Sequence, residues 1–193
     1  MDQELKWGIT REQALELMEK HLETDAMRNH CLASEAIMRH LALRMAEDPD
    51  MWGLAGLLHD LDYHETRDSM EQHTLVTEKI LGALGVDGEI IDAIKHHNAE
   101  NLGLTRSKPI HFALTAAETI TGMVVATTLV YPDKKLASVK AKSVKKRMKA
   151  KEFARSVNRD HILLCEKIGI DLDQFIEISL KAMNEISDKL GLD

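Results

Sequence analysis

The sequence contains few of the residues that mark secreted, fibrous or low-complexity proteins. Among 193 residues there are two cysteines, three prolines and ten glycines, and aromatic side chains make up 4%. Two thiols form neither a disulfide framework nor a zinc site of cysteines alone, so we expect a reducing, cytoplasmic compartment. The polar N-terminal stretch lacks the basic and apolar pattern of a secretory signal.

Strand patterns and internal repeats are also missing. No run of alternating apolar and polar residues stands out along the chain. A composition of 44% apolar and 30% charged residues is that of a globular protein, and the length suits one domain. The sequence therefore predicts a single all-α domain over residues 1–193.

Helix signals follow one another along the chain. Thr10 and Gln13 have capping-box spacing before a helix that reaches about residue 22, and apolar residues at every fourth position predict a helix over 30–46. Residues 48–50 break that helix, and the uncharged run 51–58 predicts a buried one. A loop is expected over 62–70. Further predicted helices cover 71–84, 87–97, 153–168 and 173–190.

Pro109 and Pro132 enclose a stretch whose only formally charged residue is Glu118. The stretch is long enough to cross a membrane, but its five threonines, His111 and central glutamate favour a buried central helix and no membrane contact. A lone buried carboxylate is costly unless it is neutralised, paired or metal-bound. Glu118 is therefore a protonated or threonine-bonded residue, a residue facing a solvent cleft, or a metal ligand.

Charge is distributed unevenly along the chain. Residues 134–151 contain nine lysines or arginines and no acid, although the whole chain has a net charge of −7. Such a run is commonly a solvated face, in a loop or an exposed helix. In the alternative reading, Lys142, Lys145 and Lys146 attract the phosphate of an anionic substrate. No aromatic residues interleave with the lysines, which argues against a nucleic-acid partner.

Histidine is abundant, with ten residues. His59 and Asp60 follow the uncharged run, His30 begins a predicted helix, and His73 and His97 lie on apolar helix faces. One histidine on such a face is commonly a satisfied core residue. Four of them, together with two carboxylates on buried helices, indicate a shared metal site. Mixed imidazole and carboxylate ligands suit Fe, Mn, Zn, Co or Ni rather than Ca.

The order of these residues resembles the H…HD…D signature of the HD superfamily of metal-dependent phosphohydrolases. Residues 54–63, Leu-Ala-Gly-Leu-Leu-His-Asp-Leu-Asp-Tyr, resemble the small stand-alone HDIG-type proteins, with Leu61-Asp62 where Ile-Gly is commonest. The motifs span residues 30–121, and the tail over 153–190 resembles that of small family members.

This resemblance implies a helical HD-domain fold with one or two divalent metal ions among its central helices. The implied metal ligands are His30, His59, Asp60, His73, His97 and Glu118. Glu118 stands where the family usually has Asp; it is longer by one methylene but ligates the same ions. Of the adjacent pair His96 and His97, we favour His97 as the ligand because it shares a helical stripe with Ile90 and Ile94.

The activity implied by the resemblance is hydrolysis of a phosphomonoester or phosphodiester, with a small, nucleotide-like phosphorylated substrate. Metal ions in such a site activate water, and Asp60 is placed to bridge two ions. Asp62, His64 and His96 are candidates for moving protons. The alternative function is a non-catalytic HD module that binds metal or a nucleotide for signalling.

Overall fold

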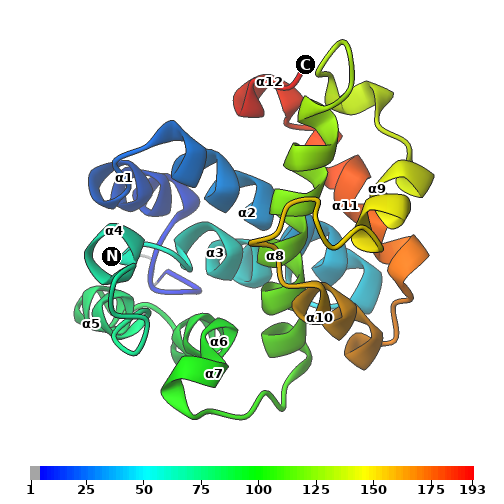
Figure 1. Ribbon diagram of the computed structural model, residues 1–193. Coiled ribbons are helices and arrows are strands. Elements are labelled where there is room, and N and C mark those ends of the chain that lie inside the picture. The colour runs from blue at the N-terminus through cyan, green and yellow to red at the C-terminus, as the bar shows by residue number, and fades with distance from the viewer. Residues whose placement is uncertain (1–4) are drawn as a thin grey trace.

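The computed structural model describes residues 5–193, and within that range every regular element is helical (Figure 1). The longer helices are α1 (Arg11–His21), α2 (Asp25–Met45), α3 (Pro49–Leu58), α5 (Leu75–Ala83), α6 (Gly88–His97), α8 (Pro109–Leu129), α9 (Ala141–Met148) and α11 (Leu172–Asn184). The short elements are α4 (Tyr63–Thr66), α7 (Ala99–Leu102), α10 (Arg159–Ile162), α12 (Ser187–Leu190) and the 3₁₀ turns η1 (Leu136–Ser138) and η2 (Leu163–Ile168). The predicted all-α class is confirmed.

Side chains placed just before the helices decide where several of them begin. Thr10 and Gln13 form the predicted capping box at the start of α1. Asp48 accepts hydrogen bonds from two backbone N–H groups of α3, and Pro49 occupies the first turn of that helix, where its missing N–H costs nothing. Asp87 caps α6 in the same way.

Helix α3 lies at the centre of the domain, in contact with α1, α2, α6 and α8 (Figure 1). All of its residues from Met51 to Leu58 are buried, as its lack of charge predicts. Gly56 lets α2 approach closely, because a Cβ at this position would lie 2.8 Å from the backbone oxygen of Ser34. The C-terminal end of α3 is therefore enclosed by α2, α6 and α8.

Helix α8 corresponds to the long apolar stretch between Pro109 and Pro132. Among the described residues it is the one helix that passes a length and hydropathy test for crossing a membrane, and 67% of its most apolar window is buried inside the domain. It contacts α2, α3, α6, α9 and α11. These contacts account for its apolar composition as that of a core helix.

Four of the predicted elements differ from the structure. Residues 71–74 form turns and α5 begins at Leu75, because Thr74 takes a left-handed φ of 77° that no continuous helix contains. The helix predicted over 153–168 begins only at Arg159, where the side chain of Asn158 caps α10. The helix predicted over 173–190 is divided into α11 and α12, and the loop predicted over 62–70 contains the single turn α4.

Candidate metal centre

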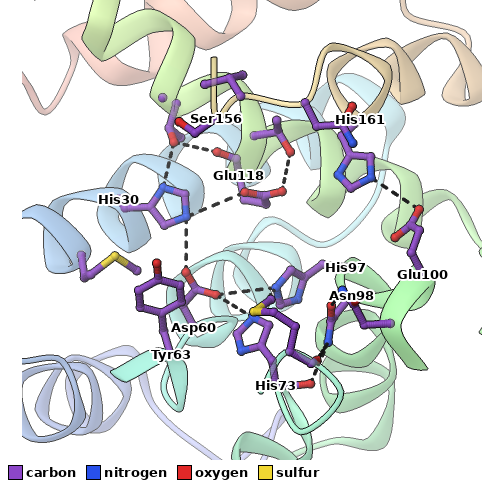
Figure 2. A pocket seen from close by; sticks show the side chains of 18 residues that line it. His30, Asp60, Tyr63, His73, His97, Asn98, Glu100, Glu118, Ser156 and His161 are labelled. Atoms are coloured by element: carbon purple, nitrogen blue, oxygen red, sulfur yellow. Dashed lines mark hydrogen bonds and ion pairs between the residues drawn. The ribbon is translucent and has the colours of Figure 1, made fainter. Parts of the chain in front are cut away.

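The predicted metal ligands meet at the C-terminal end of α3, although they come from separate parts of the chain. Figure 2 shows all of them except His59. His30 lies on α2, and His59 and Asp60 lie at the end of α3. His73 lies in the turn before α5, His97 at the end of α6 and Glu118 in the middle of α8.

Asp60 lies between two pairs of imidazoles. Its Oδ2 is 3.6 Å from His30 Nε2 and 3.5 Å from His59 Nε2. Its Oδ1 is 3.2 Å from His73 Nε2 and 3.6 Å from His97 Nε2. Each carboxylate oxygen thus faces a different pair, which is the position that a carboxylate bridging two ions needs.

Backbone carbonyls fix the protonation of two of these imidazoles. His59 Nδ1 lies 2.8 Å from the oxygen of Gly56, and His97 Nδ1 lies 2.6 Å from the oxygen of Ile94. A carbonyl oxygen only accepts hydrogen bonds, so Nδ1 carries the proton in both rings. The Nε2 atoms of His59 and His97 therefore keep their lone pairs when the rings are neutral.

In the other two imidazoles, those of His30 and His73, side chains accept the Nδ1 proton. The Thr121 hydroxyl donates to the carbonyl of Glu118 at 2.6 Å, so it accepts from His30 Nδ1 at 2.8 Å. His73 Nδ1 donates to Asp62 Oδ1 at 2.8 Å. Partners of this kind orient metal-binding histidines and raise their basicity.

The four Nε2 atoms converge in pairs as a consequence. His30 Nε2 is 3.0 Å from His59 Nε2, and His73 Nε2 is 3.1 Å from His97 Nε2. Two facing lone pairs this close are unfavourable without a proton or a cation beside them. With Asp60, each pair forms a group whose ligand atoms all lie within 4.8 Å of one another, so the residues fit two transition-metal ions that share Asp60.

The pKa of His73 is raised, whereas the pKa values of the other three imidazoles are lowered. Burial lowers the pKa of His30 and of His59 to about 4, which keeps both rings neutral near pH 7. Burial also disfavours the charge on His73, but its hydrogen bonds to Asp60 and Asp62 outweigh burial and raise its pKa to about 9. Without metal, His73 is therefore an imidazolium between two carboxylates.

Glu118 extends the His30 side of the centre. Its Oε2 is 3.9 Å from His30 Nε2, and its Oε1 is hydrogen-bonded to the hydroxyl of Thr119. Burial raises the pKa of Glu118 to about 8. The carboxyl group is thus threonine-bonded and largely protonated near pH 7, at a place where it can also reach an ion held by His30, His59 and Asp60.

The centre opens into a cavity of about 630 Å³ (Figure 2). All of the metal-centre side chains except His59 line it, together with Met27, Tyr63 and Met70. Polar residues from α7, α10 and the segment before α10 also line it. A small molecule that enters this cavity would meet these imidazoles and Asp60.

None of the three residues predicted to move protons, Asp62, His64 and His96, lines this cavity. Asp62 is fully buried; it accepts hydrogen bonds from His73 and from the backbone N–H groups of Val76 and Thr77, so it orients His73. His96 points to the other face of α6, where its Nδ1 donates to the carbonyl of Asp92 at 2.8 Å. A catalytic role for any of the three stays a prediction.

A third group of possible ligands, Asp92, His96 and His111, does not suit a metal ion. The two imidazole rings are stacked with centroids 3.8 Å apart and planes 12° from parallel. An ion bound by a ring nitrogen lies in the plane of that ring, and two parallel rings at this separation share no plane. Lys108 also pairs with Asp92 at 2.9 Å. The group therefore serves to connect α6 with α8.

The lysines predicted to bind phosphate lie away from the cavity. Lys142, Lys145 and Lys146 are on α9, and none of them is among the residues that line it. Lys145 instead pairs with Asp173 of α11. Any effect of these lysines on an anionic substrate is consequently a long-range one.

Several residues around the centre escaped the sequence analysis. Thr121 could have been found, because it lies one helical turn after Glu118 and therefore on the same face. Tyr63 could also have been found, because it directly follows the residues from His59 to Asp62. His161 gives no signal in the sequence, since its approach to the cavity depends on how α10 packs against α8.

The fold and the site together define a class of protein: an all-helical domain with histidines and carboxylates arranged for metal ions at its centre. A family model for the HD domain matches residues 27–127, which contain the whole candidate centre. The chain belongs to the HD-domain family. No curated protein and no solved structure shows significant similarity to it.

Proposed function

We propose that this protein is a metal-dependent phosphohydrolase that hydrolyses a small, nucleotide-like phosphomonoester or phosphodiester in the cytoplasm. One observation carries the proposal. Four imidazoles donate their Nδ1 protons outward and direct their Nε2 atoms at the two oxygens of Asp60. HD-domain proteins typically use such a centre for phosphate-ester hydrolysis, which supports the same activity here.

The residues fall into two sets of metal ligands. His30, His59 and Asp60 Oδ2 would hold one ion, with Glu118 as a further ligand. Asp60 Oδ1, His73 and His97 would hold the second. Divalent ions of Fe, Mn, Zn, Co or Ni suit these donors; when bound, they supply Lewis-acid activation of water and charge neutralisation at phosphoryl oxygens.

The chain's own residues position this chemistry. Asp60 holds the two sets in register, since each of its oxygens serves one pair of imidazoles. Thr121 and Asp62 orient His30 and His73 through their Nδ1 protons. Glu118 faces the cavity beside His30, where its carboxylate would add a ligand to the ion held by His30, His59 and Asp60.

A second function is favoured by one observation. Glu118 stands where the family's usual residue is Asp, and its carboxyl group already has a threonine partner. A centre altered in this way would fit an HD module that binds metal or a nucleotide without turnover and reports it to another protein. The two functions differ in whether a loaded centre hydrolyses phosphate esters.

The experiment is a hydrolysis assay of purified protein with added Mn²⁺, using p-nitrophenyl phosphate and bis-p-nitrophenyl phosphate. Metal-dependent turnover of either ester by the wild type, lost in Asp60→Ala, supports the hydrolase. Asp25→Ala is the matched control, because the Asp25 side chain is 90% exposed and does not line the cavity. A wild type that binds metal but releases no p-nitrophenol would favour the non-catalytic module.

A further inference from the structure

One wall of the cavity comes partly from outside the part of the chain that matches the HD domain. Ser156, Val157, Asn158 and His161 come from α10 and the segment before it, and all four line the cavity. Figure 2 shows Ser156 and His161 on the side of the cavity away from Asp60 and His73. Anything bound by its phosphate at the metal centre would extend toward this wall. The wall is therefore where the rest of a substrate would be recognised.

This wall is a built structure rather than a loose loop. The guanidinium of Arg159 donates to the carbonyls of Ala154 at 2.6 Å and of Val157 at 2.5 Å, and also to those of Ala150 and Phe153. One side chain thus fixes the course of four preceding peptide groups. On α8, Gly122 makes room for the segment, since a Cβ there would lie 3.1 Å from Val157 Cγ2.

The polar groups of the wall include several hydrogen-bond acceptors. Glu100 pairs with both ends of the Arg106 guanidinium, at 2.5 and 2.8 Å, and its Oε1 is 3.4 Å from His161 Nε2. Arg106 is itself enclosed, with 9% of its side chain exposed and further bonds to Thr115 and the carbonyl of His97. It pairs with Glu100 and is not among the residues that line the cavity.

The charge of the lining limits what can bind. Among residues 5–193, the side chains that line the cavity include no lysine or arginine, and outside the metal centre their one carboxylate is Glu100. A second phosphate would find no cation at this wall. Hydroxyl groups would find acceptors in Glu100, in the amide carbonyl of Asn101 and in the imidazole of His161.

We propose that this wall, formed by Glu100, Asn101, Ser156 and His161, is a subsite for the uncharged, hydroxyl-rich alcohol part of a phosphate ester that carries a single phosphoryl group. The inference rests on the proposed function for the place of the phosphate. To that function it adds the chemical class of the alcohol that leaves on hydrolysis. It also predicts that esters with a second phosphate bind poorly.

Ribose 5-phosphate and phenyl phosphate test the recognition of hydroxyl groups, since one alcohol is hydroxyl-rich and the other apolar. With Mn²⁺-loaded protein, His161→Leu should lower the ratio of kcat/KM for ribose 5-phosphate over phenyl phosphate about 3- to 10-fold, as expected for one lost hydrogen bond. Ser156→Ala should lower this ratio in the same direction. The control His40→Leu changes a histidine that pairs with Glu185 outside the cavity, and its ratio should equal that of the wild type.

Adenosine 5′-monophosphate and adenosine 5′-diphosphate test the charge limit. The wild type should prefer the monophosphate, and Glu100→Gln should weaken that preference because it removes the carboxylate and leaves Arg106 without its partner. Glu89→Gln is the control, since the Glu89 side chain is 64% exposed and does not line the cavity.

The subsite and the proposed function fail in different ways. If the wild type hydrolyses both monoesters but neither His161→Leu nor Ser156→Ala changes their ratio, the subsite is wrong and the hydrolase stands. If the wild type hydrolyses neither ester, the hydrolase is wrong. Calorimetric binding of ribose 5-phosphate to the Mn²⁺-loaded protein then decides the subsite: weaker binding in His161→Leu supports it, and unchanged or absent binding overturns it.

Discussion

Metal binding by this centre should release protons, because two of its groups hold a proton at neutral pH when no metal is bound. Burial raises the pKa of Glu118 to about 8. Despite its burial, His73 has its pKa raised to about 9 by hydrogen bonds to Asp60 and Asp62. A carboxylate and an imidazole Nε2 bind metal only when deprotonated, so each must lose its proton on metal binding.

The magnitude follows from these two pKa values. At pH 7 a group with a pKa of about 8 is about 90% protonated and one with a pKa of about 9 is almost fully protonated, so filling both positions should release about two protons. Metal affinity should therefore rise with pH, up to about 100-fold per unit below pH 8 for the filled centre. Glu118→Gln should reduce the release to about one proton and the dependence to about tenfold per unit.

Calorimetric titration with Mn²⁺ in buffers of different ionisation enthalpy measures the number of protons released. Glu89→Gln is the matched control, and its proton release should equal that of the wild type. If Glu118→Gln released as many protons as the wild type, Glu118 would not be a ligand. The argument that its burial is relieved by metal would then be refuted.

Three further changes test the packing, the orientation of a ligand and the basic helix. Gly56→Ala places a Cβ against the backbone of Ser34 and should lower the Tm in thermal melts by at least about 4 °C. Gly82→Ala is the control: its Cβ would have nothing within 4 Å, so the Tm should be unchanged or raised. Thr121→Val removes the acceptor of the His30 Nδ1 proton and should weaken Mn²⁺ binding about 10- to 100-fold by titration. Alanine at four lysines should raise KM for p-nitrophenyl phosphate more than it lowers kcat, and should flatten the fall of kcat/KM with salt; unchanged salt dependence would leave α9 a solvated face. These lysines are Lys140, Lys142, Lys145 and Lys146.

The parts of the fold that depend on local chemistry could be predicted from the sequence. Asp48 and Pro49 specify the start of α3, and the uncharged residues after them specify its burial, because both effects act within one or two helical turns. The turn that carries His73 was mispredicted for the opposite reason. Asp62 accepts the N–H groups at the start of α5, so a residue from another segment decides where that helix begins.

The candidate site could be predicted as a set of ligands but not as a geometry. Spacing and residue type placed His30, His59 and Asp60 together with the other donors. The proton arrangement that directs each Nε2 inward depends on partners such as Thr121, which is 91 positions from His30 in sequence. The sequence predicts a helix from residue 153, but the segment before α10 is held by Arg159. The hydrogen bonds of Arg159 to backbone carbonyls leave no periodic pattern in the sequence, so this segment could not be predicted.

We infer that four imidazoles and the two oxygens of Asp60 form one centre for two metal ions. Counting the ions bound per chain, by elemental analysis after Mn²⁺ loading and desalting, tests this claim most directly. The wild type should retain about two ions per chain, and Asp60→Ala, which removes the shared ligand, should retain almost none. A wild type that retains no ion and shows no Mn²⁺ binding in titration would contradict the account.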